Sequence, residues 1–220
     1  MKTIAIIPAR GGSKRLPGKN SMLLGGIPLV AHSILYAQAD SRIDAVYVST
    51  DDAEIKKIAI AYGAQVIDRP QHLAGDLEPT VTALKHVLES LESKPETVVL
   101  LQPTNPLRPK DLLQNALDSY EKGRYESLFT VTQSHQKLGK IKEDKFIPFN
   151  YEPGQRSQDL EPLYFENGLL YICKSELILN DTIISKEAYP MLIDHPFGSV
   201  DIDTLEDFDY AVYLHKKHTL

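Results

Sequence analysis

The stretch with the clearest chemistry is PARGGSKRLPGKN at residues 8–20, which holds four cations and three glycines. The cations are Arg10, Lys14, Arg15 and Lys19, and the glycines are Gly11, Gly12 and Gly18. Glycines let backbone N–H groups approach a phosphate closely, and cations without neighbouring carboxylates attract the same anion. The stretch fits neither G-x-G-x-x-G nor a Walker loop, because Ser13 and Asn20 stand where the latter needs a glycine and a hydroxyl residue. We interpret it as a phosphate-binding loop of another kind.

Two carboxylates near the end of the chain form a second candidate site. Asp201 and Asp203 lie in SVDIDT at residues 199–204, where we expect a short strand over 199–202. At a strand's period of two they would point the same way and bind one hard cation, Mg²⁺ (or Mn²⁺), through oxygen. Such a cation suits phosphoryl-type transfer, because it neutralises phosphate oxygens. A simpler interpretation, compatible with the first, is that Asp203 or Thr204 caps the last helix.

Charge is unevenly distributed along the 220 residues, whose net charge is −6. The first 39 residues carry five cations and no acid, so the remainder carries −11. An acidic surface argues against binding of nucleic acid, whereas a compact basic island suits a small anion. The lone Cys173 excludes an internal disulfide and a cysteine-based zinc site, so we expect the cytoplasm. The apolar run at residues 3–7 is too short for a signal peptide or a membrane span, and we expect neither.

Short β-branched runs alternate with longer helical ones, which predicts an α/β fold in three layers with a mostly parallel sheet. Expected strands cover residues 3–7, 45–49, 65–67, 97–101, 127–132, 168–173 and 199–202. Expected helices cover residues 28–39, 52–62, 80–93, 110–122 and a segment from about Thr204. We expect Asp51 to cap the second helix, and Gly63 and Gly123 to end the second and fourth. Ligands of such sheets bind beyond the carboxyl ends of strands, which is where residues 8–20 lie.

Residues 133–165 interrupt this alternation. They are polar and include prolines at positions 148, 153 and 162. Because a structureless loop of this length is uncommon inside a compact domain, we expect an excursion such as a hairpin arm that contacts a partner. No linker or repeat is visible elsewhere, so residues 1–220 are expected to form one domain.

Two further polar segments lie where a site would form. Gln102 begins QPTNPLR at residues 102–108, directly after the fourth expected strand, although a proline-rich turn explains that segment equally well. Arg156 and Gln158 lie on the excursion, and Asn167 follows it. An arginine can bind an acidic group and an asparagine can hydrogen-bond hydroxyls, but spacing alone does not select these residues.

In their order and spacing these segments resemble the acylneuraminate cytidylyltransferases, also called CMP-sialic acid synthetases. The resemblance rests on IIPARGGSKRLPGKN at 6–20, VSTDD at 48–52, Arg69-Pro70, LLQPTNPLR at 100–108, RSQDL at 156–160, ENG at 166–168 and SVDIDT at 199–204. It implies a nucleotide-diphosphosugar-transferase-like fold and a homodimer with an exchanged arm, which would be residues 133–165. It also implies that CTP reacts with a nonulosonic acid to give a CMP-sugar and pyrophosphate.

The resemblance also implies roles for individual residues. The implied nucleotide-binding residues are Arg10, Gly11, Gly12, Ser13, Lys19, Asn20, Arg69 and Thr80, and the sugar-binding residues are Gln102, Arg156, Gln158 and Asn167. The implied catalytic residues are Arg156, Lys19 and Asp203, and the metal ligands are Asp201 and Asp203. Three positions depart from the family's pattern: Asn105 and Ser157 replace a serine and an arginine, and Glu78 stands where a small hydroxyl residue is common.

The implied reaction is an in-line attack of the sugar's anomeric hydroxyl on the α-phosphorus of CTP. The general base and the particular sugar stay open, because sialic, legionaminic, pseudaminic and deaminated neuraminic acids all fit. Three alternatives remain. A CMP-Kdo-type synthetase would activate a related eight-carbon acid, a glycosyltransferase would use Asp201-x-Asp203 to bind a nucleotide sugar, and a non-catalytic protein would bind CTP without releasing pyrophosphate.

Overall fold

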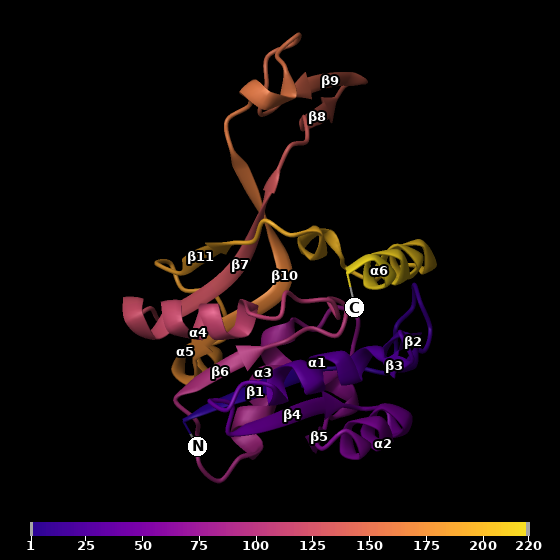
Figure 1. The fold of residues 1–220 in the computed structure, drawn as a ribbon, viewed down its shortest axis with the longest axis vertical. Helices are drawn as coiled ribbons and strands as arrows, with labels where there is room; N and C mark the ends of the chain where they lie inside the picture. Colours follow the sequence, from indigo (N-terminus) through magenta and orange to yellow (C-terminus); the bar gives the residue numbers. More distant parts are fainter. Residues whose placement is uncertain (1, 219–220) are drawn as a thin grey trace.

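A seven-stranded sheet runs through the body of the protein in the computed structural model, which describes residues 2–218 (Figure 1). Its order is β11-β7-β10-β6-β1-β4-β5. The strands are β1 (Thr3–Pro8), β4 (Ala45–Thr50), β5 (Gln65–Asp68), β6 (Thr97–Leu100), β7 (Ser127–Ser134), β10 (Leu163–Lys174) and β11 (Tyr189–Leu192). Within this sheet only β10 runs antiparallel to its neighbours, β6 and β7. The expected mostly parallel sheet is thus confirmed.

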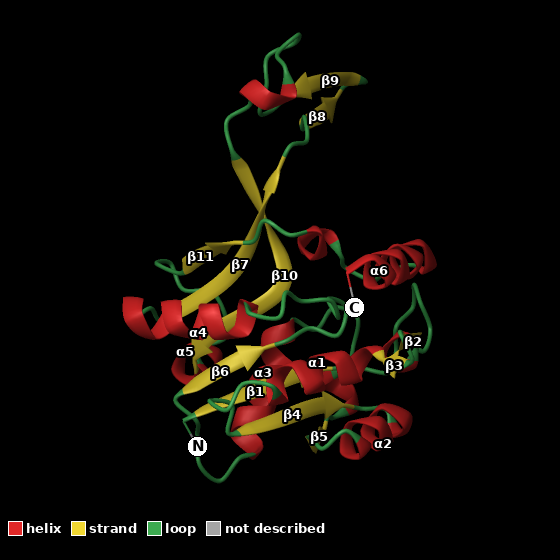
Figure 2. Ribbon diagram, in the orientation of Figure 1, coloured by secondary structure: helices red, strands yellow, loops and turns green. Residues whose placement is uncertain are grey.

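Helices cover both faces of this sheet, as the strand and helix colouring of Figure 2 shows. One face carries α1 (Leu29–Gln38), α2 (Ala53–Ala61) and α4 (Leu112–Gly123), and the other carries α3 (Thr80–Ser90) and α5 (Ser175–Leu179). In β1, Ala5 and Ile7 pack on the first face and Ile4 and Ile6 on the second. Because β1 is buried on both faces, its sequence is a continuous apolar run. The three layers predicted from the sequence are present.

A third apolar cluster joins α6 (Leu205–His218) to the body and fixes the acidic loop, which we define as residues 200–204. Val200 and Ile202 are buried there against Ala211 of α6. The expected strand over 199–202 is wrong, because residues 196–199 form a 3₁₀ turn and no strand follows it within the described chain. Burial beneath a helix produces the same alternation of apolar and polar residues as burial in a sheet. Conversely, the short edge strand β11 was not expected.

Helix α3 ends at Ser90, three residues before the predicted end, and two helices are capped by other residues than predicted. Asp52, and not Asp51, caps α2, because its Oδ1 accepts hydrogen bonds from the backbone N–H groups of residues 54 and 55 at 2.8 and 2.9 Å. Arg124, and not Gly123, takes the left-handed conformation after α4, with a φ of 53°. Gly63 follows α2 with a φ of 81°, as expected for its end. Asp51 has a different partner: its Oδ1 accepts a hydrogen bond from the N–H of Gly11 at 3.0 Å. This bond ties residues 9–20, which we call the basic loop, to the end of β4.

The long strands β7 and β10 extend beyond the sheet and carry residues 135–162, the arm, away from the body (Figure 1). The arm contains a hairpin of β8 (Gly139–Lys142) and β9 (Lys145–Pro148) and a 3₁₀ turn at Ser157–Asp159. The hairpin region exposes Ile141, Phe146 and Phe149, which are 78%, 54% and 65% accessible. Residues 133–134 and 163–165, expected within the excursion, belong to the two strands.

The remaining short elements all lie within residues 19–73. They are a two-stranded ribbon of β2 (Leu23–Leu24) and β3 (Ile27–Pro28) and 3₁₀ turns at Lys19–Ser21 and Gln71–Leu73. Across residues 2–218 no helix combines the length and the apolar character needed to cross a membrane.

Candidate active site

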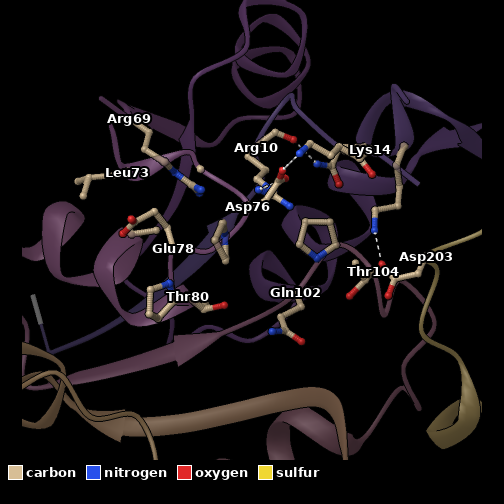
Figure 3. A pocket seen from close by; sticks show the side chains of 18 of the residues that line it. Arg10, Lys14, Arg69, Leu73, Asp76, Glu78, Thr80, Gln102, Thr104 and Asp203 are labelled. Carbon is tan, nitrogen blue, oxygen red and sulfur yellow. Dashed lines mark hydrogen bonds and ion pairs between the residues drawn. The ribbon is translucent and has the colours of Figure 1, made fainter. Parts of the chain in front are cut away.

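Loops at the carboxyl ends of the strands enclose a cavity of about 500 Å³, which we call the basic cavity (Figure 3). The basic loop follows β1, residues 102–108 follow β6, and the acidic loop leads into α6. This is the edge at which open α/β sheets bind ligands. The expected site residues that line this cavity are Arg10, Ser13, Lys19, Asn20, Arg69, Thr80, Gln102 and Asp203.

Asp76 is the counter-ion of two cations of the basic loop. Its Oδ1 lies 2.9 Å from Nη1 of Arg10, and its Oδ2 lies 2.5 Å from Nζ of Lys14. Nη1 of Arg10 also donates to the carbonyl oxygen of Ala74 at 3.4 Å. Asp76 was not expected from the sequence, because it lies in the loop before α3, far along the chain from the cations it contacts.

Asp203 is the counter-ion of the other two cations. Its carboxylate oxygens lie 2.5 Å from Nη2 of Arg15 and 3.0 Å from Nζ of Lys19. Lys19 is only 8% exposed, and its Nζ also donates to the carbonyl oxygen of Ile202 at 2.7 Å. Lys19 therefore links the basic loop to the acidic loop across the cavity. A buried ammonium placed between them can stabilise negative charge on a ligand at that point.

The backbone of the basic loop is held by side chains. Asn20 is buried, and its Nδ2 donates to the carbonyl oxygen of Arg10 at 2.9 Å. The N–H of Gly11 is used by Asp51, so it is not directed to a ligand. Gly11 and Gly12 do not line the basic cavity as described, unlike Ser13. Of the expected nucleotide-binding residues, Gly11 and Gly12 are therefore the two that lie outside the described lining of this cavity.

Arg69 lies at the other end of the basic cavity and is 8% exposed. Its Nε and Nη2 donate to the hydroxyl and carbonyl oxygens of Ser49 at 3.0 and 2.8 Å. Burial lowers the pKa of Arg69 below its ordinary value. Figure 3 shows Arg69 grouped with Glu78 and Thr80, away from Asp203. The elongated cavity thus has one end rich in cations, which suits phosphates, and one end that suits a polar ring.

A second cavity of about 360 Å³, which we call the acidic cavity, adjoins the first. Gln102 lines both cavities, whereas Asp203 lines the basic cavity and Asp201 the acidic one. The remaining lining residues of the acidic cavity are Phe165, Glu166, Asn167, Gly168, Tyr171, Gly198, Ser199 and Val200. Its described lining therefore includes two carboxylates and no cation. The expectation that both aspartates point the same way along a strand is wrong, because the acidic loop directs them to two neighbouring cavities.

Asn105 fixes the distance between the acidic loop and β10. It is 1% exposed, and its Nδ2 donates to the carbonyl oxygens of Asn167 and Val200 at 3.1 and 2.6 Å. The side chain of Asn167 is held in turn: its Oδ1 accepts from Thr130 at 2.5 Å, and its Nδ2 donates to Thr132 at 3.0 Å. Asn167 thus lies at the wall of the acidic cavity with much of its amide engaged inside the protein.

Arg108 is a structural part of the segment that carries Gln102. Its Nη2 donates to the carbonyl oxygen of Gln102 at 2.8 Å, and its Nε and Nη1 donate to the Leu169 carbonyl oxygen and the Ser33 hydroxyl at 2.6 and 3.1 Å. Burial lowers the pKa of Arg108 to about 10. In this turn, Gln102 therefore lines the cavities, whereas Arg108 supports the turn from inside the protein.

Asp201 and Asp203 are the two carboxylates of the acidic loop that could hold a hard cation, one from each of the adjoining cavities. Both offer oxygen, which Mg²⁺ takes from one or two carboxylates together with substrate phosphates. Loss of hydration, reinforced by the charge of Asp203 and opposed by a hydrogen bond from Thr104, raises the pKa of Asp201. A bound cation would favour the charged form of this carboxylate. Residues 2–218 hold no group of three or more His, Cys, Asp or Glu side chains placed for a metal, so further ligands would come from substrate or water.

Arg156 and Gln158 lie on the arm, outside both cavities. Nε and Nη2 of Arg156 lie 2.7 and 3.0 Å from the carboxylate oxygens of Asp159, and its side chain is 70% exposed. Figure 1 shows the arm leaving the body between β7 and β10. Within one chain, the structure therefore does not bring Arg156 and Gln158 to the expected site residues that line the two cavities.

Tyr171 is a further lining residue that the sequence did not indicate. Its hydroxyl donates to Oε1 of Glu166 at 2.5 Å, and burial together with that carboxylate raises the pKa of Tyr171. The pairing register of β10 with β7 shifts between these two residues, a bulge of the kind that redirects side chains beside active sites. The available signal was Gly168, whose φ is 74°, because a glycine inside a strand often marks a bulge.

The fold is that of solved nucleotidyltransferases. A CMP:2-keto-3-deoxy-manno-octonic acid synthetase solved with CTP superposes with a TM-score of 0.72, at 18% identity over 99% of each chain. A 4-diphosphocytidyl-2C-methyl-D-erythritol synthase from Anaerococcus prevotii gives a TM-score of 0.71, at 16% identity over 98% of this chain and 96% of that one. Identities this low define the architecture alone.

Sequence comparison then defines the family. A family model described as cytidylyltransferase matches residues 4–220, so the chain belongs to the cytidylyltransferase family. It is 35% identical to a CMP-N,N'-diacetyllegionaminic acid synthase from Legionella pneumophila, over 94% of both chains. It is 33% identical to a pseudaminic acid cytidylyltransferase from Campylobacter jejuni, over 98% of this chain and 97% of that one. An N-acylneuraminate cytidylyltransferase from Streptococcus agalactiae matches 96% of this chain at 33% identity, and the chain spans about half (53%) of that relative's length.

Proposed function

We propose that the chain transfers CMP from CTP to a nonulosonic acid, with release of pyrophosphate. The observation that carries this proposal is the pair of adjoining cavities, one rich in cations and one bounded by Asp201, which share Gln102 and meet at the acidic loop. A nucleotide in the first and a sugar acid in the second would meet at that loop. Family membership supports the choice of CTP. The names of relatives, which specify acylneuraminate, diacetyllegionaminic and pseudaminic acids, support the class of sugar.

In the basic cavity, Arg10, Lys14 and Lys19 bind the triphosphate in this proposal. Arg69 and Thr80 bind the nucleoside end, where the cations are fewer. Preorganised donors stabilise charge more effectively in a partly dry site than in water. Lys19, the least exposed of the loop's cations, is best placed to stabilise the charge that develops on the departing pyrophosphate.

In the reaction, the oxygen of the anomeric hydroxyl forms a bond to the α-phosphorus of CTP. The bond from that phosphorus to the bridging oxygen breaks, pyrophosphate leaves with the electron pair of that bond, and the proton of the hydroxyl is released to water. Gln102, which lines both cavities, hydrogen-bonds the sugar at the point of attack. When bound to Asp201 and Asp203, Mg²⁺ (or Mn²⁺) would neutralise phosphate oxygens and make the hydroxyl more acidic.

The arm is proposed to complete the site of a second copy in a homodimer. Exposed apolar side chains on the arm, such as Ile141 and Phe149, favour burial against another surface. The acidic cavity contains no cation among its described lining residues, yet the proposed substrate is an acid. Arg156, with Gln158 two residues away, would supply this charge from the partner's arm and neutralise the sugar carboxylate or the phosphate.

We place the reaction in the cytoplasm. The grounds are that Cys173 is a free, buried thiol and that single unpaired cysteines are typical of reducing compartments.

The proposed partners are small anions and not nucleic acid. The net charge of −6 disfavours binding to a nucleic-acid backbone, whereas small anions can bind locally at the basic loop.

The test is an acceptor panel with purified protein, CTP and Mg²⁺. Sialic, legionaminic, pseudaminic and deaminated neuraminic acids and Kdo are each supplied alone, and pyrophosphate and the CMP-sugar are quantified. We expect release with at least one of the first four acids. Release with Kdo alone would identify the Kdo-type alternative. CTP binding without release for any acceptor would refute the transferase. In a parallel reaction supplied with a CMP- or UDP-sugar in place of CTP, consumption of that nucleotide sugar would indicate a glycosyltransferase.

A further inference from the structure

Asp76 lines the basic cavity, and its carboxylate points toward Arg10 and Lys14 of the basic loop (Figure 3). Its two oxygens contact Arg10 at 2.9 Å and Lys14 at 2.5 Å. The hydrogen bond from Lys14, with a smaller contribution from Arg10, lowers the pKa of Asp76, so the carboxylate is charged at neutral pH. In charge and in hydrogen bonding, a carboxylate held between two cations occupies them as a phosphate would.

The basic loop is anchored without this contact. Asp51 holds the N–H of Gly11, Asn20 holds the carbonyl oxygen of Arg10, and Lys19 is bound to the acidic loop. The side chains of Arg10 and Asp76 are 33% and 34% exposed, and that of Lys14 is 82% exposed. The ion pairs can therefore open without leaving a charge buried and unpaired, and without releasing the loop.

We propose that Asp76 is an internal counter-ion of the phosphate subsite, and that polyphosphate displaces its carboxylate from Arg10 and Lys14. The inference rests on the proposed nucleotide site. A ligand whose phosphates reach Arg10 and Lys14 must break the ion pairs of Asp76, and this cost weakens its binding. A ligand confined to the Arg69 end leaves these ion pairs intact, so its affinity is unaffected. Asp76 thus sets the affinity for CTP and for pyrophosphate, and its return to the cations favours release of pyrophosphate.

The test is calorimetric titration at low salt, because exposed charges are screened at high salt. Wild-type protein and the Asp76→Asn variant are titrated separately with inorganic pyrophosphate, CTP and cytidine. The matched control is Asp118→Asn, which also removes one partly exposed carboxylate, paired with Arg42 at 2.5 Å, but at a position that lines none of the described cavities. Both variants are checked for an unchanged Tm, and Asp76→Ser serves as a second, smaller replacement.

We expect Asp76→Asn and Asp76→Ser to tighten pyrophosphate and CTP by about threefold to tenfold, as removal of one charge near 4 Å in water implies. Cytidine affinity and all affinities of Asp118→Asn should match the wild type. Unchanged or weaker pyrophosphate binding in both Asp76 variants would overturn this inference alone. Wild-type protein that binds neither CTP nor pyrophosphate would overturn the nucleotide site with it. Because no acceptor sugar is needed, failure of the acceptor panel leaves this result interpretable.

Discussion

The basic and acidic cavities present opposite electrostatic problems. The basic cavity is lined by five cations and by the carboxylates of Asp76, Glu78 and Asp203, so a single chain supplies its positive charge and its internal counter-ions. The acidic cavity is lined by Glu166 and Asp201 and by no cation in the described part of the chain. A site for a polyphosphate can therefore be built from one loop and its neighbours. A site for an acidic sugar needs positive charge from beyond these walls.

The proposed function offers two sources of that charge. A cation held by Asp201 and Asp203 would lie at the junction of the two cavities. Arg156 of another copy would enter from the arm. The basic cavity is thus self-sufficient in positive charge, and the acidic cavity depends on charge from outside its walls. Removing each source in turn tests this difference.

The largest effect is expected for Asp203→Ala. It removes one proposed metal ligand and the counter-ion of the nearly buried Lys19, at the junction of both cavities. Loss of one preorganised charge-stabilising contact costs about 3 kcal/mol, or about a hundredfold in kcat. Steady-state pyrophosphate release at saturating Mg²⁺ and CTP measures it, with Asp209→Ala, an exposed change on α6, as the control. Near-wild-type turnover of Asp203→Ala would contradict the metal and catalytic role.

The next effect concerns the dependent cavity. Arg156→Ala should lower turnover with the sugar acid by about tenfold or more, because charge-assisted hydrogen bonds of this kind contribute about 1.5–3 kcal/mol. CTP affinity should hardly change, since Arg156 does not line the basic cavity.

Mixing the two impaired variants Arg156→Ala and Asp203→Ala shows which chain supplies Arg156. If arms are exchanged, a dimer of one Arg156→Ala chain and one Asp203→Ala chain has one intact site, so random mixing restores about a quarter of wild-type activity. No recovery after mixing, with dimers formed, would show that Arg156 acts within its own chain.

The difference between the basic and acidic cavities also explains which parts of the site the sequence could predict. The basic loop was found from residue types because its determinants are local: a buried strand ends at Pro8, and four cations and three glycines follow within 13 residues. The parallel sheet was predicted for the same reason, since apolar strands buried on both faces have a simple pattern.

The acidic cavity depends on contacts between distant segments, which a single sequence does not reveal. Val200 and Ile202 alternate with polar residues as a strand would, but they are buried by α6. Asn105 and Asn167 meet across the sheet edge although they are 62 positions apart. Asp76 is no more distinctive in sequence than other surface aspartates until the fold brings it to Arg10.

A smaller effect is expected in the basic cavity for Arg10→Ala. It should weaken CTP by about fivefold to tenfold, less than removal of a free arginine, because part of its charge is already neutralised by Asp76. Cytidine binding, which needs only the Arg69 end, should be unchanged. Isothermal titration of both ligands measures this, with Arg124→Ala, outside the basic cavity, as the control. Unchanged CTP affinity would refute the assignment of the basic loop.

The smallest effect concerns the support of the acidic loop that both cavities share. In α1, Nε2 of His32 lies 2.9 Å from the carbonyl oxygen of Leu24, whose side chain packs with Val200 and Ile202 in the α6 cluster. Burial lowers the pKa of His32 below 6.5, and the hydrogen bond to Leu24 only partly opposes this. The unfolded chain therefore binds the proton more tightly, so this contribution to stability is complete above pH 6.5 and declines as the pH falls below it.

Calorimetric Tm values between pH 7.5 and 5 should show this decline as a loss of Tm attributable to His32, at about 2–4 °C for each kcal/mol in a chain of this size. His32→Gln keeps a donor for the Leu24 carbonyl oxygen without titrating, so its Tm should fall less over the same range. His135→Gln, an exposed change at the base of the arm, should follow the wild type. Parallel curves for His32→Gln and wild type would contradict the assignment. A steeper loss of Tm in the wild type than in His32→Gln would assign the acid sensitivity to the cluster that packs α6 against the acidic loop. That loop forms the junction of the two cavities, so protonation of His32 would weaken the support of this junction.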